Sequence, residues 1–351
     1  METVLAKKIK DRIRKHGPIT FRDFMALALY DSEYGFYIKG PGIGTRRGTF
    51  NTNAMFPAFA FALTRAIQHA EGLVGEPLRI MEFGGGTGEL ASNLRSFLST
   101  PHEYVIVDIS PGFRTQQTGR GFQAIDSVDS LPPAPTFAFG NEVLDALPVH
   151  RVMGDGFGEL LEFFVAIDGK GEFFEQPDIP STPLLAERLR SEGIILGRGH
   201  IAEICLDLDE FMEKMARPIA RGYLALIDYG EEASSLYSYS RRNGTLRSFR
   251  SQQEVFNPFE WVGDQDLTAD VDFTALKRAA TKAGLQSTGC LQQGTWLTNL
   301  GIQDYRKVVE DIRSAEEEIF FLTNPARLGS TFDVALFKTE GIPDGCSLHL
   351  R

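Results

Sequence analysis

The chain has 351 residues, of which 42% are hydrophobic and 24% charged, a balance typical of a soluble globular protein. One hydrophobic core seldom grows to this length, so we expect a main domain with a substantial inserted or appended part. The 36 Lys and Arg residues against 47 Asp and Glu residues give a net charge of −11. This charge argues against nucleic-acid binding and allows a cationic partner, although acidity that serves solubility alone is the preferred interpretation.

The cysteines and the N-terminus indicate a reducing, cytoplasmic location. Cys205, Cys290 and Cys346 are far apart and lack Cys-x-x-Cys spacing, so neither a disulfide framework nor a zinc site is indicated. The first 15 residues contain acids and have the pattern of an amphipathic helix rather than a signal peptide. No apolar run reaches membrane-spanning length, so we expect no membrane insertion. The oligomeric state stays open.

Helical patterns open the chain. The sequence predicts a helix to about Lys15, a Gly-Pro-Ile-Thr turn, and a second helix from Thr20, a good N-cap, to about Tyr30. A loop rich in glycine and aromatic residues follows from Asp31 to Gly48. An Ala- and Phe-rich helix then covers Pro57 to Ala70.

Strands and helices alternate further along. Strands are expected at Leu78, at Tyr104, near Phe122 and at Thr136 to Gly140, as in a doubly wound α/β sheet. After Pro148 the pattern changes to two antiparallel strands, Val149 to Val152 and Glu159 to Ile167, and a mainly helical stretch, Pro183 to Arg221. The remaining expected elements are a strand at Gly222 to Asp228, a helix at Asp272 to Ala283, a strand at Gln293 to Leu297, a helix at Ile302 to Phe321 and a strand at Phe332 to Phe337.

The most informative stretch is Leu78 to Gly88, where an apolar run leads through the glycine turn G-G-G-T-G into a helix. A second apolar run, Tyr104 to Asp108, also ends in an acid. This pattern predicts a βαβ unit with a nucleotide in its crevice, because glycines let the backbone approach a ligand and a helix N-terminus offers unpaired N–H groups. Asp108 would accept hydrogen bonds from ribose hydroxyls. A tight turn without a ligand is the alternative.

Spacing distinguishes two nucleotide cofactors. Read from Gly86, the loop fits a dinucleotide pattern but leaves three extra residues after the strand. Read from Gly84, it is G-x-G-x-G preceded by Glu82, whose carboxylate would face the ammonium group of S-adenosyl-L-methionine and repel a pyrophosphate. We therefore expect S-adenosyl-L-methionine. The expected cofactor-binding residues are Glu82, Gly84, Gly86, Gly88, Asp108, Asp126 and Asn141. Asp126, after the third strand, would contact the adenine amino group; in the alternative it is a turn residue.

Candidate catalytic groups follow the strand at Thr136 to Gly140. Methyl transfer from a sulfonium needs a positioned nucleophile and no metal. Glu142 and Asp145, spaced i, i+3, would share one face of a helical turn and could hold a guanidinium. In the alternative, Asp145 caps a turn and Glu142 is solvated. His150 is a candidate general base, or a structural histidine at the start of a strand.

Motifs in a shared order over nearly the whole chain resemble the MidA family of class I methyltransferases. Besides the glycine loop they are Gly17 to Tyr37, Asn141 to Arg151 (N-E-V-L-D-A-L-P-V-H-R), Asp228 to Gly230, Asn243 to Leu246, Asp266 to Phe273 and Gln293 to Ile302 (Q-G-T-W-L-T-N-L-G-I). The family includes the arginine methyltransferase of mitochondrial complex I assembly and bacterial relatives. The resemblance implies a Rossmann-like doubly wound sheet with N-terminal helices and an inserted α+β lid, S-adenosylmethionine, and methyl transfer.

Departures from the family pattern gather on the acceptor side. Thr49, Ala54 and Met55 replace an acid, a proline and a second acid, while Gln252 and Asp270 replace two histidines. The cofactor side is kept, with Asp108 in place of the usual Glu. A changed acceptor is therefore an open possibility.

The expected organisation has four parts. They are an N-terminal helical and Gly/aromatic loop region (1–75), a cofactor-binding Rossmann-like domain (76–150 and 222–340), an inserted lid or acceptor subdomain (151–221) and a tail (341–351). The leading function, from the resemblance, is methylation of a protein arginine. A small-molecule N- or O-methyltransferase and a non-catalytic assembly factor that retains the fold are the alternatives, so the expected partner is an acceptor protein or a small molecule.

Overall fold

The computed structural model describes residues 2–40, 52–250 and 253–345. Contacts divide the chain into two compact units. The first unit comprises residues 1–39, 144–208 and 230–275, and the second comprises residues 40–143, 209–229 and 276–351. Residues 1–39 thus share a unit with 144–208, whereas the sequence patterns separated these segments. The boundaries of functional domains stay a prediction.

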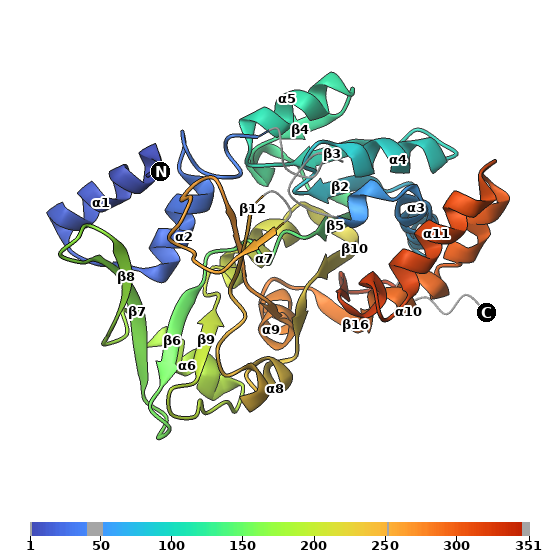
Figure 1. The fold of residues 1–351 in the computed structure, drawn as a ribbon. Coiled ribbons are helices and arrows are strands. Elements are labelled where there is room, and N and C mark those ends of the chain that lie inside the picture. Colours follow the sequence, from blue (N-terminus) through green and yellow to red (C-terminus); the bar gives the residue numbers. More distant parts are fainter. Residues whose placement is uncertain (1, 41–51, 251–252, 346–351) are drawn as a thin grey trace. The chain divides into compact units, whose positions relative to one another are not determined.

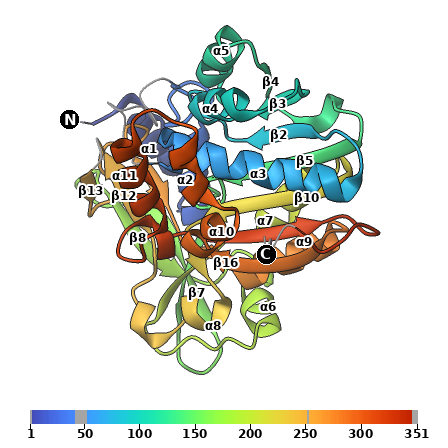
Figure 2. The same cartoon turned by 90° about the vertical axis from the view of Figure 1, so that its right-hand side faces the viewer.

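The second unit is built on a seven-stranded sheet in the order β16-β17-β10-β5-β2-β3-β4 (Figure 2). Its strands are β2 (Arg79–Phe83), β3 (Tyr104–Val107), β4 (Gln123–Ile125), β5 (Ala134–Asn141), β10 (Ile219–Asp228), β16 (Gln286–Gln292) and β17 (Asp333–Lys338). All neighbours from β4 to β10 are parallel, while β17 is antiparallel to β10 and β16. The strand order reverses at β2, which confirms the predicted doubly wound sheet. Ligands bind at the carboxyl ends of the strands beside such a reversal.

Helices pack on this sheet because strand side chains alternate between its faces. Phe59 and Ile67 of α3 are fully buried in one core with Phe137 of β5, and Figure 2 shows α3 lying over the strands of the sheet. Met215 of α7 and Leu226 of β10 both lie near Gly140. The helices of this unit are α3 (Pro57–Val74), α4 (Glu89–Phe97), α5 (Pro111–Gly119), α7 (Leu208–Ala216), α9 (Phe273–Lys282), α10 (Gln293–Asn299) and α11 (Ile312–Thr323), with α7 and α9 beginning in the first unit.

The first unit contains a five-stranded antiparallel sheet, of which Figure 1 labels β6, β7, β8 and β9. Both β1 and β8 pair with β7. Its strands are β1 (Ile19–Thr20), β6 (His150–Gly154), β7 (Leu160–Ile167), β8 (Phe173–Asp178) and β9 (Ile201–Ile204). Two smaller sheets are formed by β11 (Gly230–Glu231) with β15 (Val271–Asp272), and by β12 (Arg247–Arg250), β13 (Gln253–Val255) and β14 (Asp266–Thr268). The helices are α1 (Val4–His16), α2 (Phe21–Tyr30), α6 (Leu184–Ser191) and α8 (Ala233–Leu236).

The predicted start of α2 is confirmed in detail. The Thr20 hydroxyl accepts a hydrogen bond of 3.0 Å from the Asp23 N–H, which satisfies one of the free donors of the first turn. Phe21 and Phe24 of α2 then pack with Phe173 and Phe259 in an aromatic cluster. The helix is therefore held by its cap and by one apolar face.

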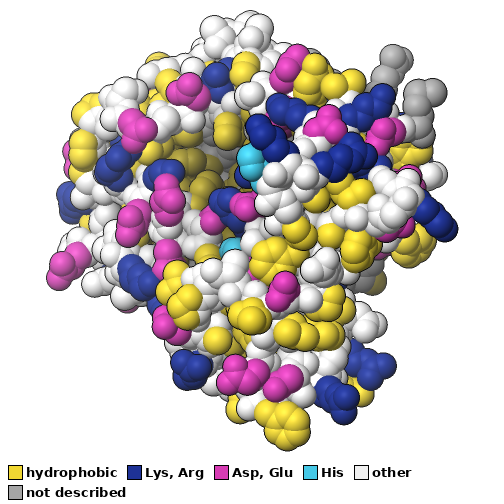
Figure 3. Space-filling view, turned by 90° about the vertical axis from the view of Figure 1, so that its left-hand side faces the viewer, with side chains coloured by type: hydrophobic (Ala, Val, Ile, Leu, Met, Phe, Trp, Pro, Cys, Tyr) yellow, Lys and Arg dark blue, Asp and Glu magenta, His cyan; other side chains and the backbone are white. Residues whose placement is uncertain are grey.

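Several large hydrophobic side chains near β7 and β8 remain exposed. They include Leu161, Phe174 and Ile179, the last being 78% exposed. In Figure 3, hydrophobic side chains gather over the lower part of the face that is turned to the viewer. No helix in the described ranges is both long and apolar enough to span a membrane.

Three predicted elements differ from the structure. Residues 293–297 were expected as a strand but form α10, in which Trp296 and Leu297 are both fully buried. Consecutive residues of a strand point to opposite faces, whereas a helix can bury both on one side. The expected helix at 302–321 is divided into a 3-10 helix, Ile302–Lys307, and α11, which starts at its own N-cap, Asp311. The stretch 183–221, expected as mainly helical, also contains β9 and the start of β10.

Candidate functional site

The glycine loop between β2 and α4 has the left-handed backbone that its sequence predicts. Gly84, Gly86 and Gly88 have φ angles of 69°, 50° and 73°. A Cβ atom on Gly84 would lie 2.4 Å from Val143 Cγ1, so a side chain has no room there. A Cβ atom on Gly86 would meet no atom of the described residues within 4 Å. The loop therefore presents an open surface at Gly86.

Asp108, directly after β3, is buried and bonded to this loop. Its Oδ2 accepts hydrogen bonds from the Gly86 N–H (3.1 Å) and from Gln117 Nε2 (2.9 Å), and its Oδ1 accepts one from the Ser110 N–H (2.9 Å). Burial raises the pKa of Asp108 although these hydrogen bonds oppose the shift. A carboxylate has about four lone-pair sites, so three donors leave capacity for a ribose hydroxyl.

Glu82 of β2 lies below the loop, with its Cδ 3.5 Å from the position of a Cβ on Gly85. It is buried and accepts a hydrogen bond of 2.7 Å from the Tyr104 hydroxyl. Burial raises the pKa of Glu82 to about 7; the Tyr104 hydrogen bond lowers it and the charge of Asp108 raises it. With this pKa, the carboxyl group of Glu82 changes from its protonated to its ionised form near neutral pH.

Asp126 lies apart from these groups. Its side chain is 73% exposed, and its carboxylate is 3.9 Å from Arg114 Nη2. An adenine contact by Asp126 stays a prediction, as does the alternative of a turn residue.

A chain of polar side chains in the second unit ends at Glu142. Glu142 Oε1 accepts hydrogen bonds from the Thr52 hydroxyl (2.6 Å) and from Asn141 Nδ2 (2.7 Å). Asn141 Oδ1 accepts a hydrogen bond of 3.0 Å from Asn53 Nδ2, and Asn53 is bonded in turn to Gln293. Asn53 and Gln293 are completely buried. The carboxylate of Glu142 is therefore held from one side by a fixed set of donors.

The backbone of Glu142 is strained. Its φ angle is 55°, a left-handed conformation that side chains other than those of Asn and Asp seldom adopt. The Glu142 N–H donates to the Ile227 carbonyl (2.9 Å), and the next N–H, of Val143, donates to Asp228 Oδ2 (3.0 Å). The carboxyl end of β10 thus holds Glu142 in this conformation. Such strain costs on the order of 1–3 kcal/mol and clusters at functional sites.

Burial raises the pKa of Glu142, and the hydrogen bonds from Thr52, Asn141 and the Asn53 N–H only partly oppose this shift. A raised pKa makes the carboxylate a stronger base. Glu142 is therefore suited to accept a proton from a bound group.

The predicted helical turn that would align Glu142 with Asp145 is wrong. Residues 142–149 form bends and turns, with the Leu147 N–H bonded to the Leu144 carbonyl. The strained backbone of Glu142 and its bonds to β10 prevent a helix from starting there. Asp145 belongs to the first unit, where burial, and then the charges of Asp266 and Asp145, raise the pKa of Tyr37.

His150 lies in the first unit, on β6. Its Nδ1 is 2.7 Å from Oε1 of Glu162, a fully buried carboxylate. Burial alone would raise the pKa of Glu162, but hydrogen bonds from His150 and Ser181 lower it. The position of His150 favours the structural interpretation over the role of general base.

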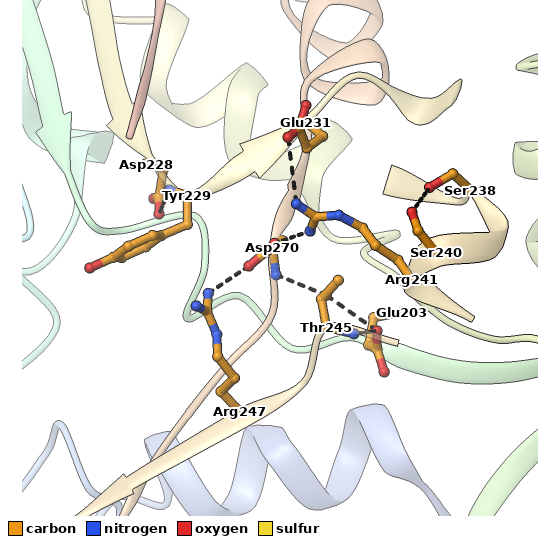
Figure 4. A network of polar contacts seen from close by, with 10 residues as sticks. All are labelled: Glu203, Asp228, Tyr229, Glu231, Ser238, Ser240, Arg241, Thr245, Arg247 and Asp270. Carbon is orange, nitrogen blue, oxygen red and sulfur yellow. Dashed lines mark hydrogen bonds and ion pairs between the residues drawn. The ribbon is translucent and has the colours of Figure 1, made fainter. Parts of the chain in front are cut away.

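The family position occupied here by Asp270 is part of a polar network in the first unit (Figure 4). Arg241 Nη1 and Arg247 Nη2 each lie 2.5 Å from one carboxylate oxygen of Asp270. The Asp270 N–H donates to the Thr245 hydroxyl (3.1 Å), and the Thr245 N–H donates to Glu203 (2.7 Å). Asp270 is therefore neutralised by two arginines and fixes the N-G-T-L turn. Two other departures, Thr49 and Gln252, lie outside the described residues.

Sequence reasoning missed four residues of the site. Thr52 and Asn53 lie in the segment that departs from the family pattern, and Gln293 opens the motif that was expected as a strand. Gln117 lies on α5, where no motif marks it. Their roles depend on contacts between segments far apart in sequence, which periodicity does not encode.

These features fit an adenosyl cofactor, because the open surface at Gly86 lies next to Asp108, which has acceptor capacity left and is bonded to the Gly86 N–H. Residues 61–291 match the model of a protein family described as "Putative S-adenosyl-L-methionine-dependent methyltransferase". The zebrafish (Danio rerio) protein named protein arginine methyltransferase NDUFAF7, mitochondrial, is 26% identical over 93% of this chain and 85% of its own length. Its human counterpart, with the same name, is 26% identical over 94% of this chain and 82% of its own length.

Two crystal structures of proteins from Burkholderia thailandensis show the same fold. One, bound to S-adenosyl-homocysteine, has a TM-score of 0.88 and 30% identity over 97% of this chain and 93% of that chain. The other, a native structure, has a TM-score of 0.86 and 29% identity over 99% and 94% of the two chains. The predicted family, enzyme class and cofactor are thus confirmed, and the chain belongs to the MidA-like family of S-adenosyl-L-methionine-dependent methyltransferases.

Proposed function

We propose that this methyltransferase modifies an arginine side chain of a protein, and that Glu142 receives the guanidinium. The single observation that carries the proposal is the carboxylate of Glu142, which Thr52 and Asn141 hold at a strained backbone position after β5. The names of the zebrafish and human relatives, at 26% identity, support arginine as the acceptor.

A guanidinium is a poor nucleophile because its lone pairs are delocalised and its pKa lies far above neutral. S-adenosylmethionine supplies an electrophilic methyl group on a sulfonium. A nitrogen–methyl bond forms as the sulfur–methyl bond breaks, and one guanidinium N–H proton must leave. Glu142 orients the guanidinium and takes this proton, a role that its raised pKa supports.

We assign the cofactor contacts to the loop and its neighbours. Gly84 and Gly88 shape the turn, and Gly86 offers the open surface on which the cofactor lies. Asp108 accepts a hydrogen bond from a ribose hydroxyl. The carboxyl group of Glu82 stabilises the positive charge of the cofactor's ammonium group.

Asn141 Nδ2 donates to Glu142 in the described chain, and we propose that Asn141 also contacts the cofactor. We propose structural roles for Asp145 and His150, because other groups of the first unit already engage both.

A cytoplasmic location remains part of the proposal. The observation that supports a reducing compartment is the wide separation of the three cysteines in the sequence, which lack Cys-x-x-Cys spacing. The curated relatives are named mitochondrial. Cell fractionation with an antibody against this protein separates the two locations.

The experiment that tests the acceptor uses methyl-tritiated S-adenosylmethionine. The full chain is incubated with the protein fraction, and separately with the small-molecule fraction, of the cells that express it. Acid hydrolysis of the labelled protein should release methylated arginine. Label confined to the small-molecule fraction would replace the arginine proposal with the metabolite alternative, and label on another amino acid would also contradict it.

A further inference from the structure

We infer that Gln117 of α5 is a positioning residue for the cofactor. Its amide joins the glycine loop to Asp108, the carboxylate proposed to accept a hydrogen bond from the ribose. The inference rests on the proposed role of Asp108. It concerns a side chain that marks no motif in the sequence.

The contacts of Gln117 fix the orientation of its amide. Nε2 donates to the Gly86 carbonyl (2.8 Å) and to Asp108 Oδ2 (2.9 Å). Both neighbours are acceptors, so only the nitrogen can face them, and the flipped amide is excluded. The side chain is completely buried. Both N–H groups are therefore used on the two segments that the cofactor would contact.

The other end of the amide is unsatisfied. Gln117 Oε1 is buried and has no hydrogen-bond partner among the described residues. A buried acceptor without a donor costs about 1–3 kcal/mol, and an apolar side chain of similar size would avoid that penalty. Packing of α5 alone does not explain glutamine here. The two bonds of the nitrogen do.

These bonds fix the carboxylate of Asp108 before a ligand arrives. Oδ2 is held by the Gly86 N–H and by Gln117, while Oδ1 is held by the Ser110 N–H. The same Gln117 nitrogen holds the Gly86 carbonyl, so loop and acid keep one relative position. A site that is fixed in advance loses less conformational freedom on binding and binds more tightly.

The test measures binding of S-adenosylhomocysteine to the full chain by calorimetry at 25 °C. Q117L removes both donors at nearly constant size and should weaken binding at least tenfold. Gln116→Leu is the matched control, since Gln116 is the adjacent residue of the same helix, is partly exposed, and has a side chain that forms no hydrogen bond among the described residues. Its affinity should stay within twofold of wild type. Urea unfolding of each variant shows that the protein tested is folded.

Q117E gives a readout that a packing role would not produce. Its carboxylate would face two acceptors, the Gly86 carbonyl and Asp108, and should be repelled at pH 8. Protonation at lower pH restores one donor, so the ratio of wild-type to variant affinity should shrink as the pH falls from 8 to 5. This measurement also decides the matter if Q117L does not fold.

Two results would overturn the inference: a folded Q117L with wild-type affinity, or an affinity ratio for Q117E that does not change with pH. No acceptor is present in these experiments, so their outcome is independent of the arginine proposal. Wild-type affinity in Asp108→Ala would instead remove the role of Asp108 on which the inference rests.

Discussion

Asn53 and Gln293, 240 positions apart in the chain, exchange two amide hydrogen bonds. Asn53 Nδ2 donates to Gln293 Oε1 (2.7 Å), and Gln293 Nε2 donates to Asn53 Oδ1 (3.1 Å). Asn53 Nδ2 also donates to Asn141, which in turn holds Glu142. The start of α10 is thereby connected to the proposed catalytic carboxylate.

Breaking this amide pair should destabilise the fold. Gln293→Leu removes both hydrogen bonds between residue 293 and the buried Asn53 amide. It should lower the free energy of unfolding by about 1–3 kcal/mol, as measured in urea. Gln292→Leu, at the exposed neighbouring position, should have little effect. The double variant with Asn53→Leu should lose less than the sum of the two single losses, because each single change already breaks the pair. Strictly additive losses would show that the two amides are not coupled.

Side chains at Gly86 should block the cofactor. The position borders open space, so Gly86→Val would place a branched side chain where S-adenosylmethionine is proposed to lie. Gly86→Ala is the control, since it carries the same backbone strain at φ 50° with much less bulk. Calorimetry with S-adenosylhomocysteine should show no binding for the valine variant and weakened binding for the alanine variant. Equal affinities in the two variants would mean that the open space is not the cofactor site.

The carboxylate of Asp108 should contribute directly to affinity. Asp108→Ala removes the proposed ribose acceptor and should weaken S-adenosylhomocysteine binding by about 1–3 kcal/mol. Asp126→Ala, which removes an exposed carboxylate, tests the predicted adenine contact by the same measurement. Binding of NAD to the wild-type protein, with an affinity like that of S-adenosylhomocysteine, would contradict the reading of the loop from Gly84.

Glu82 should make stability depend on pH near neutrality. In the unfolded chain its carboxyl group loses its proton near pH 4.5, whereas in the folded protein it does so at about pH 7. Between these values the folded state binds more protons, so its stability falls as the pH rises, by at most about 1.4 kcal/mol per pH unit. Urea unfolding at pH 5 and pH 8 should show this loss in wild type and in Glu103→Gln, an exposed control. The loss should be smaller in Glu82→Gln, where only other buried carboxyl groups with a raised pKa, such as Asp108 and Glu142, contribute. The same loss in Glu82→Gln would assign it to other groups.

Much of the fold could be predicted from sequence because the relevant signals are local. The Thr20 cap and the apolar runs of β2 and β3 lie within a few residues of the elements they define. A strand was predicted at 293–297 because Q-G-T-W-L has a composition typical of strands. The segment instead forms a helix, in which the consecutive residues Trp296 and Leu297 are both buried. Among the residues that the structure describes, the preceding polar strand β16 pairs only with β17, so it lacks the apolar pattern of a central strand.

The site was only partly predictable for a related reason. The glycine loop and Asp108 are defined by spacing within one βαβ unit, and the structure brings them into hydrogen-bond contact. The position of Glu142 depends on the carboxyl end of β10 and on Thr52, neither of which its own sequence neighbourhood specifies. The i, i+3 spacing would align Glu142 with Asp145 only in a helix, which the strained backbone of Glu142 does not allow. Residue spacing therefore located the carboxylate but not its partners.

The most direct test of the proposed function is single-turnover methyl transfer to the arginine-bearing acceptor by Glu142→Gln. The substitution should lower the rate by roughly 2–4 kcal/mol in transition-state stabilisation, while the affinity for S-adenosylhomocysteine stays close to that of wild type. Asp145→Asn, in the turn that follows, is the control and should keep a near-normal rate. A near-normal rate for Glu142→Gln with a methylated arginine as product would contradict the account and remove this carboxylate from the mechanism.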